Sequence, residues 1–204
     1  MDKYPHRLGI GLIPSPDEIK AIYGLSQDLT QSQDLSFFLQ PGISIPHLTL
    51  FQGKFSDESA VIKALSSIDL SSFTPQQIIK GISVWAQKIV FLDCLKSQDL
   101  ADLHTQVFKV LFPLCEGTSA DPQNFQGITE GQQKAFEATG YPFSREEYLP
   151  HFTLAHLSNP QIGSPPETLS HSKVLSEVHF TKLVVYRVGD LGACLDFAYE
   201  KSII

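Results

Sequence analysis

A short apolar segment centred on one histidine occurs twice in this chain, once in each half. Residues 45–50 read IPHLTL and residues 149–154 read LPHFTL, so Pro, His, Thr and the last Leu are identical. In a strand, residues i and i+2 point to the same face, so each histidine is expected to share a face with the threonine after it. An internal sequence repeat of this kind indicates that the fold contains similar structural units. We therefore expect two related halves that each contribute one of these strands.

The repeated residue types are suited to acid–base chemistry at a phosphate. Histidine titrates near neutrality, so one neutral imidazole can accept a proton while one imidazolium donates a proton to a departing oxygen. Thr49 and Thr153 can hold non-bridging phosphate oxygens as neutral donors, which requires no metal. The candidate catalytic residues are therefore His47, His151, Thr49 and Thr153. A third H-x-T at His179 lacks the preceding proline and is followed by Lys182, so it is not a third copy.

The remaining pattern predicts strands that alternate with three helices, which gives an α+β or a mixed α/β sandwich. Strands are expected over residues 7–13, 45–52, 77–95 (two strands), 149–157, 178–188 and 193–199. Helices are expected over residues 16–28, 57–67 and 98–114, with Ser15, Ser56 and Ser97 as their N-terminal caps. Between residues 116 and 148 the periodicity weakens, which predicts a long excursion with one helical turn near residues 132–138. A further loop is expected at residues 159–166.

Charge and cysteine content exclude several classes of protein. A net charge of −7 and a pI near 5.4 argue against a broad basic surface for long nucleic acid, but a small nucleotide or a short RNA end needs only a few local cations. Three widely spaced cysteines suggest neither a zinc knuckle nor a disulfide framework. Because no apolar stretch has the length of a membrane span or the form of a signal peptide, we expect a cytoplasmic protein. The pattern does not indicate an oligomeric state.

The paired PHxTL segments resemble the signature of the two-histidine phosphoesterase superfamily, which includes bacterial RNA 2′,3′-cyclic phosphodiesterases once described as 2′-5′ RNA ligases. The early RLGIGLIP strand with its helix and the closing LVVYRVGDLG strand follow the same order. The resemblance implies one bilobal domain over residues 1–204, with two pseudo-symmetric antiparallel sheets, flanking helices and a central cleft. It also implies cofactor-free hydrolysis of a 2′,3′-cyclic phosphate or a 2′-5′ phosphodiester, with the two motif histidines as catalytic residues and the threonines holding phosphate.

Three further residues are candidates for contact with substrate. Members of the family often carry Arg where this chain has His156. By simple alternation His156 points away from His151, so it reaches the cleft only if the strand bulges or ends there. Phe51 shares the predicted face of His47 and could stack on a base or pack in the core. Tyr186, on the last long strand, could line the cleft or be a core residue.

Two other functions are compatible with the same residues. One is a nucleotide-binding module that keeps the two-histidine site without catalysis. The other is a metal-dependent hydrolase in which His47, His151 and His156 hold zinc, although this would leave the repeated threonines unexplained. The sequence contains neither a GxSxG elbow nor a GxxxxGK[ST] phosphate loop.

Overall fold

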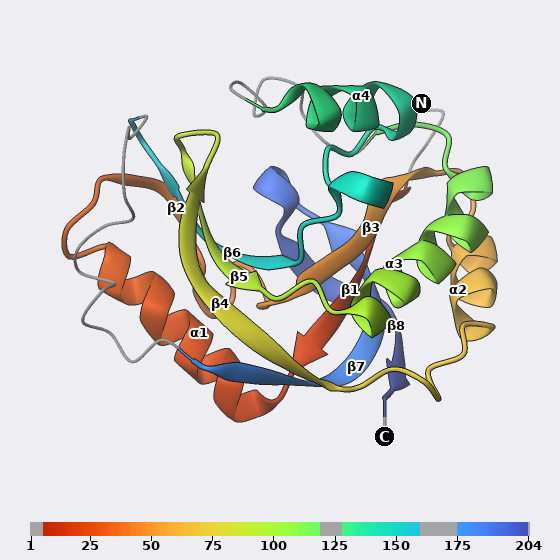
Figure 1. The fold of residues 1–204 in the computed structure, drawn as a ribbon, viewed down its shortest axis with the longest axis horizontal. Helices are drawn as coiled ribbons and strands as arrows, with labels where there is room; N and C mark the ends of the chain where they lie inside the picture. Colours follow the sequence, from red (N-terminus) through yellow and green to blue (C-terminus); the bar gives the residue numbers. More distant parts are fainter. Residues whose placement is uncertain (1–5, 119–127, 160–174, 204) are drawn as a thin grey trace.

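One antiparallel sheet of eight strands dominates the computed structural model, which describes residues 6–118, 128–159 and 175–203. The first half of the sheet contains β1 (His6–Pro14), β3 (Leu48–Phe55), β7 (Glu177–Val188) and β8 (Cys194–Ser202). The second half contains β2 (Leu35–Phe38), β4 (Gln76–Trp85), β5 (Ile89–Cys94) and β6 (His151–Leu157). The halves curve around a common centre (Figure 1).

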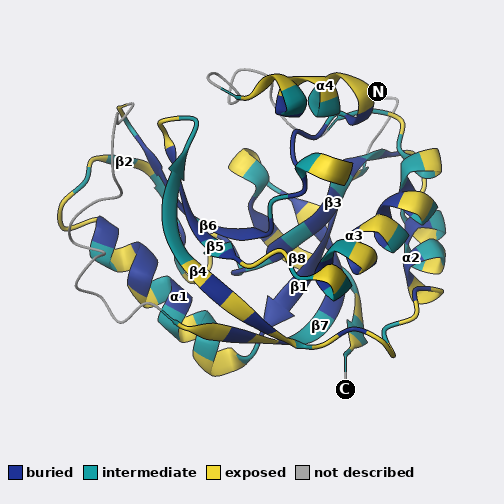
Figure 2. Cartoon of the chain, in the orientation of Figure 1, coloured by how far each residue is buried: buried dark blue, intermediate teal, exposed yellow. Residues whose placement is uncertain are grey.

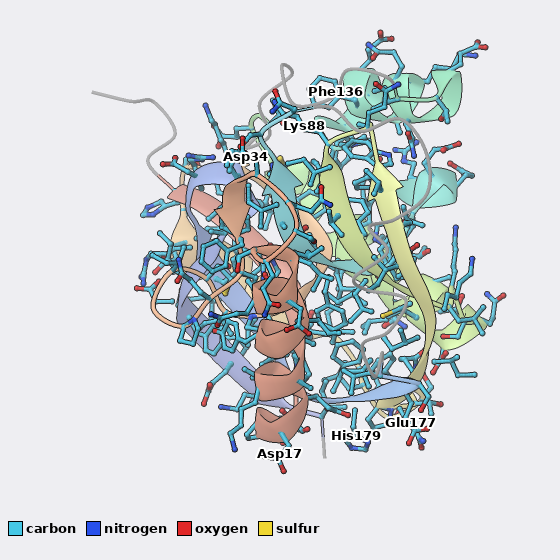
Figure 3. All side chains as sticks on the ribbon, turned by 90° about the vertical axis from the view of Figure 1, so that its left-hand side faces the viewer. Asp17, Asp34, Lys88, Phe136, Glu177 and His179 are labelled. Carbon is cyan, nitrogen blue, oxygen red and sulfur yellow. The ribbon has the colours of Figure 1, made fainter. Side chains whose placement is uncertain are left out.

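A short ladder between β4 and β7 joins the two halves. Gln76 pairs with His179 and Ile78 pairs with Glu177. Figure 3 shows Glu177 and His179 at one end of the molecule, while Lys88 and Asp34 lie at the opposite end. The halves therefore meet at one end through continuous backbone hydrogen bonding. This architecture confirms the predicted α+β fold, and the ladder joins the two predicted antiparallel sheets into one.

Helices α1 (Pro16–Leu29), α2 (Glu58–Ser66) and α3 (Gln98–Leu111) cover the outer faces of the two halves (Figure 1). Helix α4 (Glu130–Thr139) lies at the end of the molecule opposite the ladder between β4 and β7. Helix α1 packs against the second half, where the Ser26 hydroxyl donates to the Leu154 carbonyl at 2.6 Å. Helices α2 and α3 pack against the first half. Apolar residues on both faces of β1 and on the inner faces of the helices are buried (Figure 2).

The predicted helix starts are confirmed with one change of cap. Ser15 begins α1 in a capping box, in which Glu18 accepts from the Ser15 backbone N–H at 3.0 Å and from its hydroxyl at 2.7 Å. Ser97 begins α3 as predicted. At α2 the cap is Asp57, not Ser56, because the Asp57 carboxylate accepts from two backbone N–H groups of the first turn. An ionised cap adds a favourable interaction with the helix dipole.

Three predicted elements differ from the observed ones. The helical turn expected near residues 132–138 is the longer helix α4, which Thr129 caps and which ends at Gly140 in the left-handed conformation. Strand β2 was not among the predicted strands, and β3 begins at Leu48, after the histidine of the motif. Residues 119–127 of the predicted excursion and 160–174, which include most of the predicted loop, lie outside the described residues. No helix in the described ranges is both long and apolar enough to span a bilayer.

Candidate active site

The two repeated motifs meet in the middle of the molecule, although they are remote in sequence. His47 directly precedes β3 and His151 is the first residue of β6, and these strands lie against each other (Figure 1). Both histidines and both motif threonines, Thr49 and Thr153, line one cavity of about 120 Å³. A water needs roughly 10–15 Å³ measured in this way, so the cavity has room for a phosphate-sized group with water. The structure thus brings together the four residues that the repeat singled out.

Strand β6 contains a β-bulge at the last leucine of its motif. The ladder with β5 shifts between Thr153 and Ala155, so Leu154 has no partner of its own. An extra residue of this kind changes which face the following side chains occupy. His156 therefore shares a side with His151 and lines the cavity with 6% of its surface exposed. This is the bulge on which the expectation for His156 depended.

Strand β3 has the same bulge at the equivalent leucine. The ladder with β1 shifts between Thr49 and Phe51, so Leu50 is the extra residue. Phe51 consequently points into the core, where its ring packs edge-on against Phe108 at 5.5 Å. The expectation that Phe51 faces the cleft is wrong, because simple alternation ignores the bulge. Gln52 lines the cavity instead and takes the position in the first motif that His156 takes in the second.

Each catalytic candidate is held in one tautomer by its own backbone. Nδ1 of His47 lies 2.8 Å from the Ile45 carbonyl, and Nδ1 of His151 lies 2.7 Å from the Leu149 carbonyl. A carbonyl only accepts, so Nδ1 carries the hydrogen in both rings. Nε2 is therefore the nitrogen left to accept a proton in each neutral ring. The same geometry occurs in both motifs.

Burial makes both imidazoles weak bases. Desolvation lowers the pKa of His47 to about 4 and the pKa of His151 to about 4, although the hydrogen bond to the backbone opposes the shift in each case. The charge of His47 contributes to the lowered pKa of His151, so the two rings are close enough to interact electrostatically. Near pH 7 and without a ligand, both rings are neutral.

Aromatic neighbours fix the orientation of the two imidazoles. His151 stacks on Phe91 with ring centroids 3.7 Å apart, and Phe143 contacts it edge-on at 5.1 Å. His47 packs on the ring of Tyr186 at 4.6 Å. Packing of this kind limits rotation of the ring and preorganises Nε2 for proton transfer.

Tyr186 supports the site from below and does not line the cavity. It is fully buried, and its hydroxyl lies 3.2 Å from Oγ1 of Thr49. The ring fits because strand β1 has glycine beneath it: a Cβ at Gly9 would lie 2.1 Å from Cζ of Tyr186. Of the two roles considered for Tyr186, the structure supports the core residue, which contacts His47 and Thr49 and does not line the cleft.

The other lining residues favour a small anion with an aromatic group. Among the described residues that line the cavity there is no Asp, Glu or Cys, and Arg7 supplies a permanent positive charge. Burial and, to a smaller extent, the charge of Lys88 lower the pKa of His156 to about 4, so His156 adds no charge near pH 7. Five aromatic residues contribute to the remaining wall, namely Phe37, Trp85, Phe91, Tyr141 and Phe143. Within the described ranges, no three His, Cys, Asp or Glu side chains are grouped as metal ligands would be.

Several residues that line the cavity were not named as candidates from the sequence. Gln52 had a usable signal, because it stands five residues after its histidine, as His156 does. Tyr141 and Phe143 belong to the segment interpreted as a long excursion, and only the fold shows that they lie over the second motif. Arg7 precedes the glycine-containing part of β1, and no spacing rule connects it to the histidines.

Solved structures share this fold over nearly the whole chain. TT0787 of Thermus thermophilus has a TM-score of 0.58 and 14% identity, covering 97% of this chain and 97% of that chain. LigT of E. coli in complex with ATP has a TM-score of 0.54 and 14% identity, covering 97% and 98%. LigT in complex with 3′-AMP has a TM-score of 0.52 and 14% identity, covering 98% and 98%. No protein-family model and no curated protein sequence matches this chain.

Proposed function

We propose that this chain, which has a LigT-like fold, is a metal-independent phosphodiesterase of the two-histidine type. Its substrate is a 2′,3′-cyclic phosphate or a 2′-5′ phosphodiester in a nucleotide or a short RNA end. The observation that carries the proposal is the matched pair of histidines in one cavity, each with Nδ1 bonded to its own backbone and Nε2 free to exchange a proton. The lack of carboxylates among the described residues that line the cavity suits an anionic phosphate.

In the proposed reaction, one neutral imidazole accepts a proton at Nε2 from the attacking water. The water oxygen forms a bond to phosphorus, and the bond from phosphorus to the ribose oxygen breaks. The second histidine, protonated at Nε2, donates that proton to the departing ribose oxygen. The hydroxyls of Thr49 and Thr153 and the Arg7 guanidinium stabilise the negative charge on the non-bridging oxygens. A bound phosphate also favours the protonated form of one histidine, because an opposite charge nearby raises its pKa.

The solved neighbours support a small nucleotide as ligand. Structures of E. coli LigT contain ATP, NADP+ or 3′-AMP. In this chain the aromatic wall around Trp85 and Phe143 offers flat faces against which a base could stack. We propose that the base lies against this wall while the phosphate lies between His47 and His151.

Substitution of each motif histidine tests the proposal. His47→Ala and His151→Ala are expected to reduce turnover by roughly 10²–10⁴-fold, because each removes one positioned proton-transfer group. His179→Ala is the matched control, since it removes the histidine of the incomplete third H-x-T on an exposed strand position. The assay follows products from 2′,3′-cyclic mononucleotides and from 2′-5′ and 3′-5′ dinucleotides, with and without EDTA.

The same assay separates the proposal from its alternatives. Full turnover in either motif variant contradicts two-histidine catalysis, and loss of activity in EDTA indicates a metal-dependent hydrolase. A nucleotide-binding module without catalysis has one specific observation in its favour, namely that both imidazoles are neutral near pH 7. That alternative predicts micromolar nucleotide binding by calorimetry with no product after long incubation.

A further inference from the structure

A second cavity lies away from the proposed active site, between α3 and the turn η3 (Arg145–Glu147). Its volume is about 630 Å³, compared with about 120 Å³ for the cavity of the two histidines. Sites for small organic ligands typically measure roughly 300–1,000 Å³, so the second cavity has the size of a ligand site. Its apolar lining comes from Ala101, Phe108, Phe112, Pro113 and Tyr148.

Three cations border this cavity without acidic partners. Within the described residues, Lys96, Lys109 and Arg145 form no ion pair. Lys96 donates to the backbone carbonyl of Glu146 at 3.0 Å, and the Arg145 guanidinium lies over the Phe108 ring at 5.1 Å. Glu146 is the one acid among the described lining residues. In a chain with a net charge of −7, this is a local excess of positive charge.

His104 fixes one wall of the cavity through two hydrogen bonds and a ring stack. Its Nδ1 donates to the Leu50 carbonyl at 2.8 Å, and its Nε2 accepts the backbone N–H of Arg145 at 3.0 Å. The His104 ring also stacks on Tyr148, with centroids 4.0 Å apart and planes 4° from parallel. Arg145 has φ 56°, a conformation uncommon for a residue with a side chain. Strain of this kind is found preferentially at functional sites.

We propose that this second cavity binds a flat aromatic anion. The aromatic ring of the ligand packs against Phe112 and Tyr148, and its carboxylate, sulfonate or phosphate group lies between Lys109 and Arg145. The guanidinium keeps its N–H donors available for an anion, because its flat face rests on the Phe108 ring. This inference does not depend on the proposed phosphodiesterase activity, since the two cavities share no lining residue.

Binding of 2-naphthoate to the full chain tests the inference. Titration calorimetry is expected to show one saturable site, and the amide NMR signals of α3 and η3 are expected to shift while those of β6 do not. Lys109→Glu is expected to weaken binding by about fivefold or more. Lys63→Glu is the matched control, because Lys63 is also the basic residue in the last turn of an exposed helix but lies outside the cavity.

A second pair of variants tests the cavity by volume. Thr105→Trp, at an exposed position that lines the cavity, is expected to abolish 2-naphthoate binding, while Gln98→Trp on the same helix does not. A parallel titration with AMP tests whether the site prefers a phosphate to a carboxylate. A titration with neutral 2-naphthol tests whether binding requires the negative charge. The inference is overturned if 2-naphthoate shows no saturable binding, if both charge variants bind equally, or if 2-naphthol binds as tightly as the anion.

Discussion

Each of the two motif histidines makes a hydrogen bond within its own segment, and this bond determines the tautomer of its ring. In both motifs the carbonyl two residues before the histidine fixes Nδ1 as the protonated nitrogen. The tautomer is therefore set locally and does not depend on how the two halves meet. Tertiary packing adds burial, which lowers the pKa of each ring to about 4. At the residue scale the site is thus two neutral imidazoles that need a proton before one can act as an acid.

This protonation requirement predicts how the reaction depends on pH. Near pH 8 almost all molecules carry two neutral histidines, and the fraction with one imidazolium rises about tenfold for each unit that the pH falls towards a pKa of about 4. We therefore expect kcat/KM for a 2′,3′-cyclic nucleotide to increase from pH 8 to pH 6. Steady-state kinetics at pH 8, 7 and 6 measure this. A kcat/KM that is constant or falls over this range contradicts acid catalysis by either ring.

Among the elements, strands β3 and β6 show which features of the site the sequence could predict and which it could not. The repeat predicted that the two motifs converge, because identical residue types at identical spacing indicate a shared task. The positions after the motif depended on a bulge, and Leu50 and Leu154 look like ordinary apolar strand residues. Simple alternation therefore misplaced Phe51 and left His156 undecided. A bulge is defined by the partner strand, so the motif alone could not reveal it.

A glycine in strand β1, Gly9, affects the site indirectly because it leaves room for the ring of Tyr186. A Cβ at Gly9 would lie 2.1 Å from Cζ of Tyr186, so Gly9→Ala must displace the ring that supports His47 and Thr49. We expect a loss of stability of roughly 1–3 kcal/mol, as for other overpacked cores, together with lower turnover. Urea unfolding and the cyclic-nucleotide assay measure the two effects.

Gly24→Ala is the control for this substitution. Gly24 lies at an exposed position inside α1, and nothing lies within 4 Å of an added Cβ. Alanine there is expected to stabilise the protein by roughly 0.5–1 kcal/mol, because glycine is a poor helix former, and to leave turnover unchanged. Equal effects of the two substitutions would show that Gly9 has no special relation to Tyr186.

For the whole molecule, the pairing of two halves decides which residues become functional neighbours. Sequence periodicity predicted which segments form most of the strands and where three helices begin, because these features depend on neighbouring residues. The ladder between β4 and β7 could not be predicted, since neither strand carries a signal for its partner. The same limit applies to Tyr141 and Phe143, which come from a weakly patterned segment and lie in the cavity wall only through long-range packing.

Folding also buries four histidines whose titration affects stability in acid. Burial lowers the pKa of each from 6.5 to about 4: His47, His104, His151 and His156. As the pH falls from about 6.5 to 4, the unfolded chain binds protons that the folded chain does not. The stability that each neutral ring contributes is therefore fully present above pH 6.5 and is lost through this window, at up to about 1.4 kcal/mol per pH unit for each ring.

We accordingly expect acid unfolding to begin well above pH 4, because four such rings together remove up to roughly 5 kcal/mol per pH unit from a total typically near 5–15 kcal/mol. Urea unfolding at pH 7.5, 6.5 and 5.5 measures the slope. His104→Gln lowers stability at every pH, but it should also reduce the slope by about one proton. A purely structural role for His104 predicts the loss of stability without the change in slope, so the slope identifies its buried, neutral state.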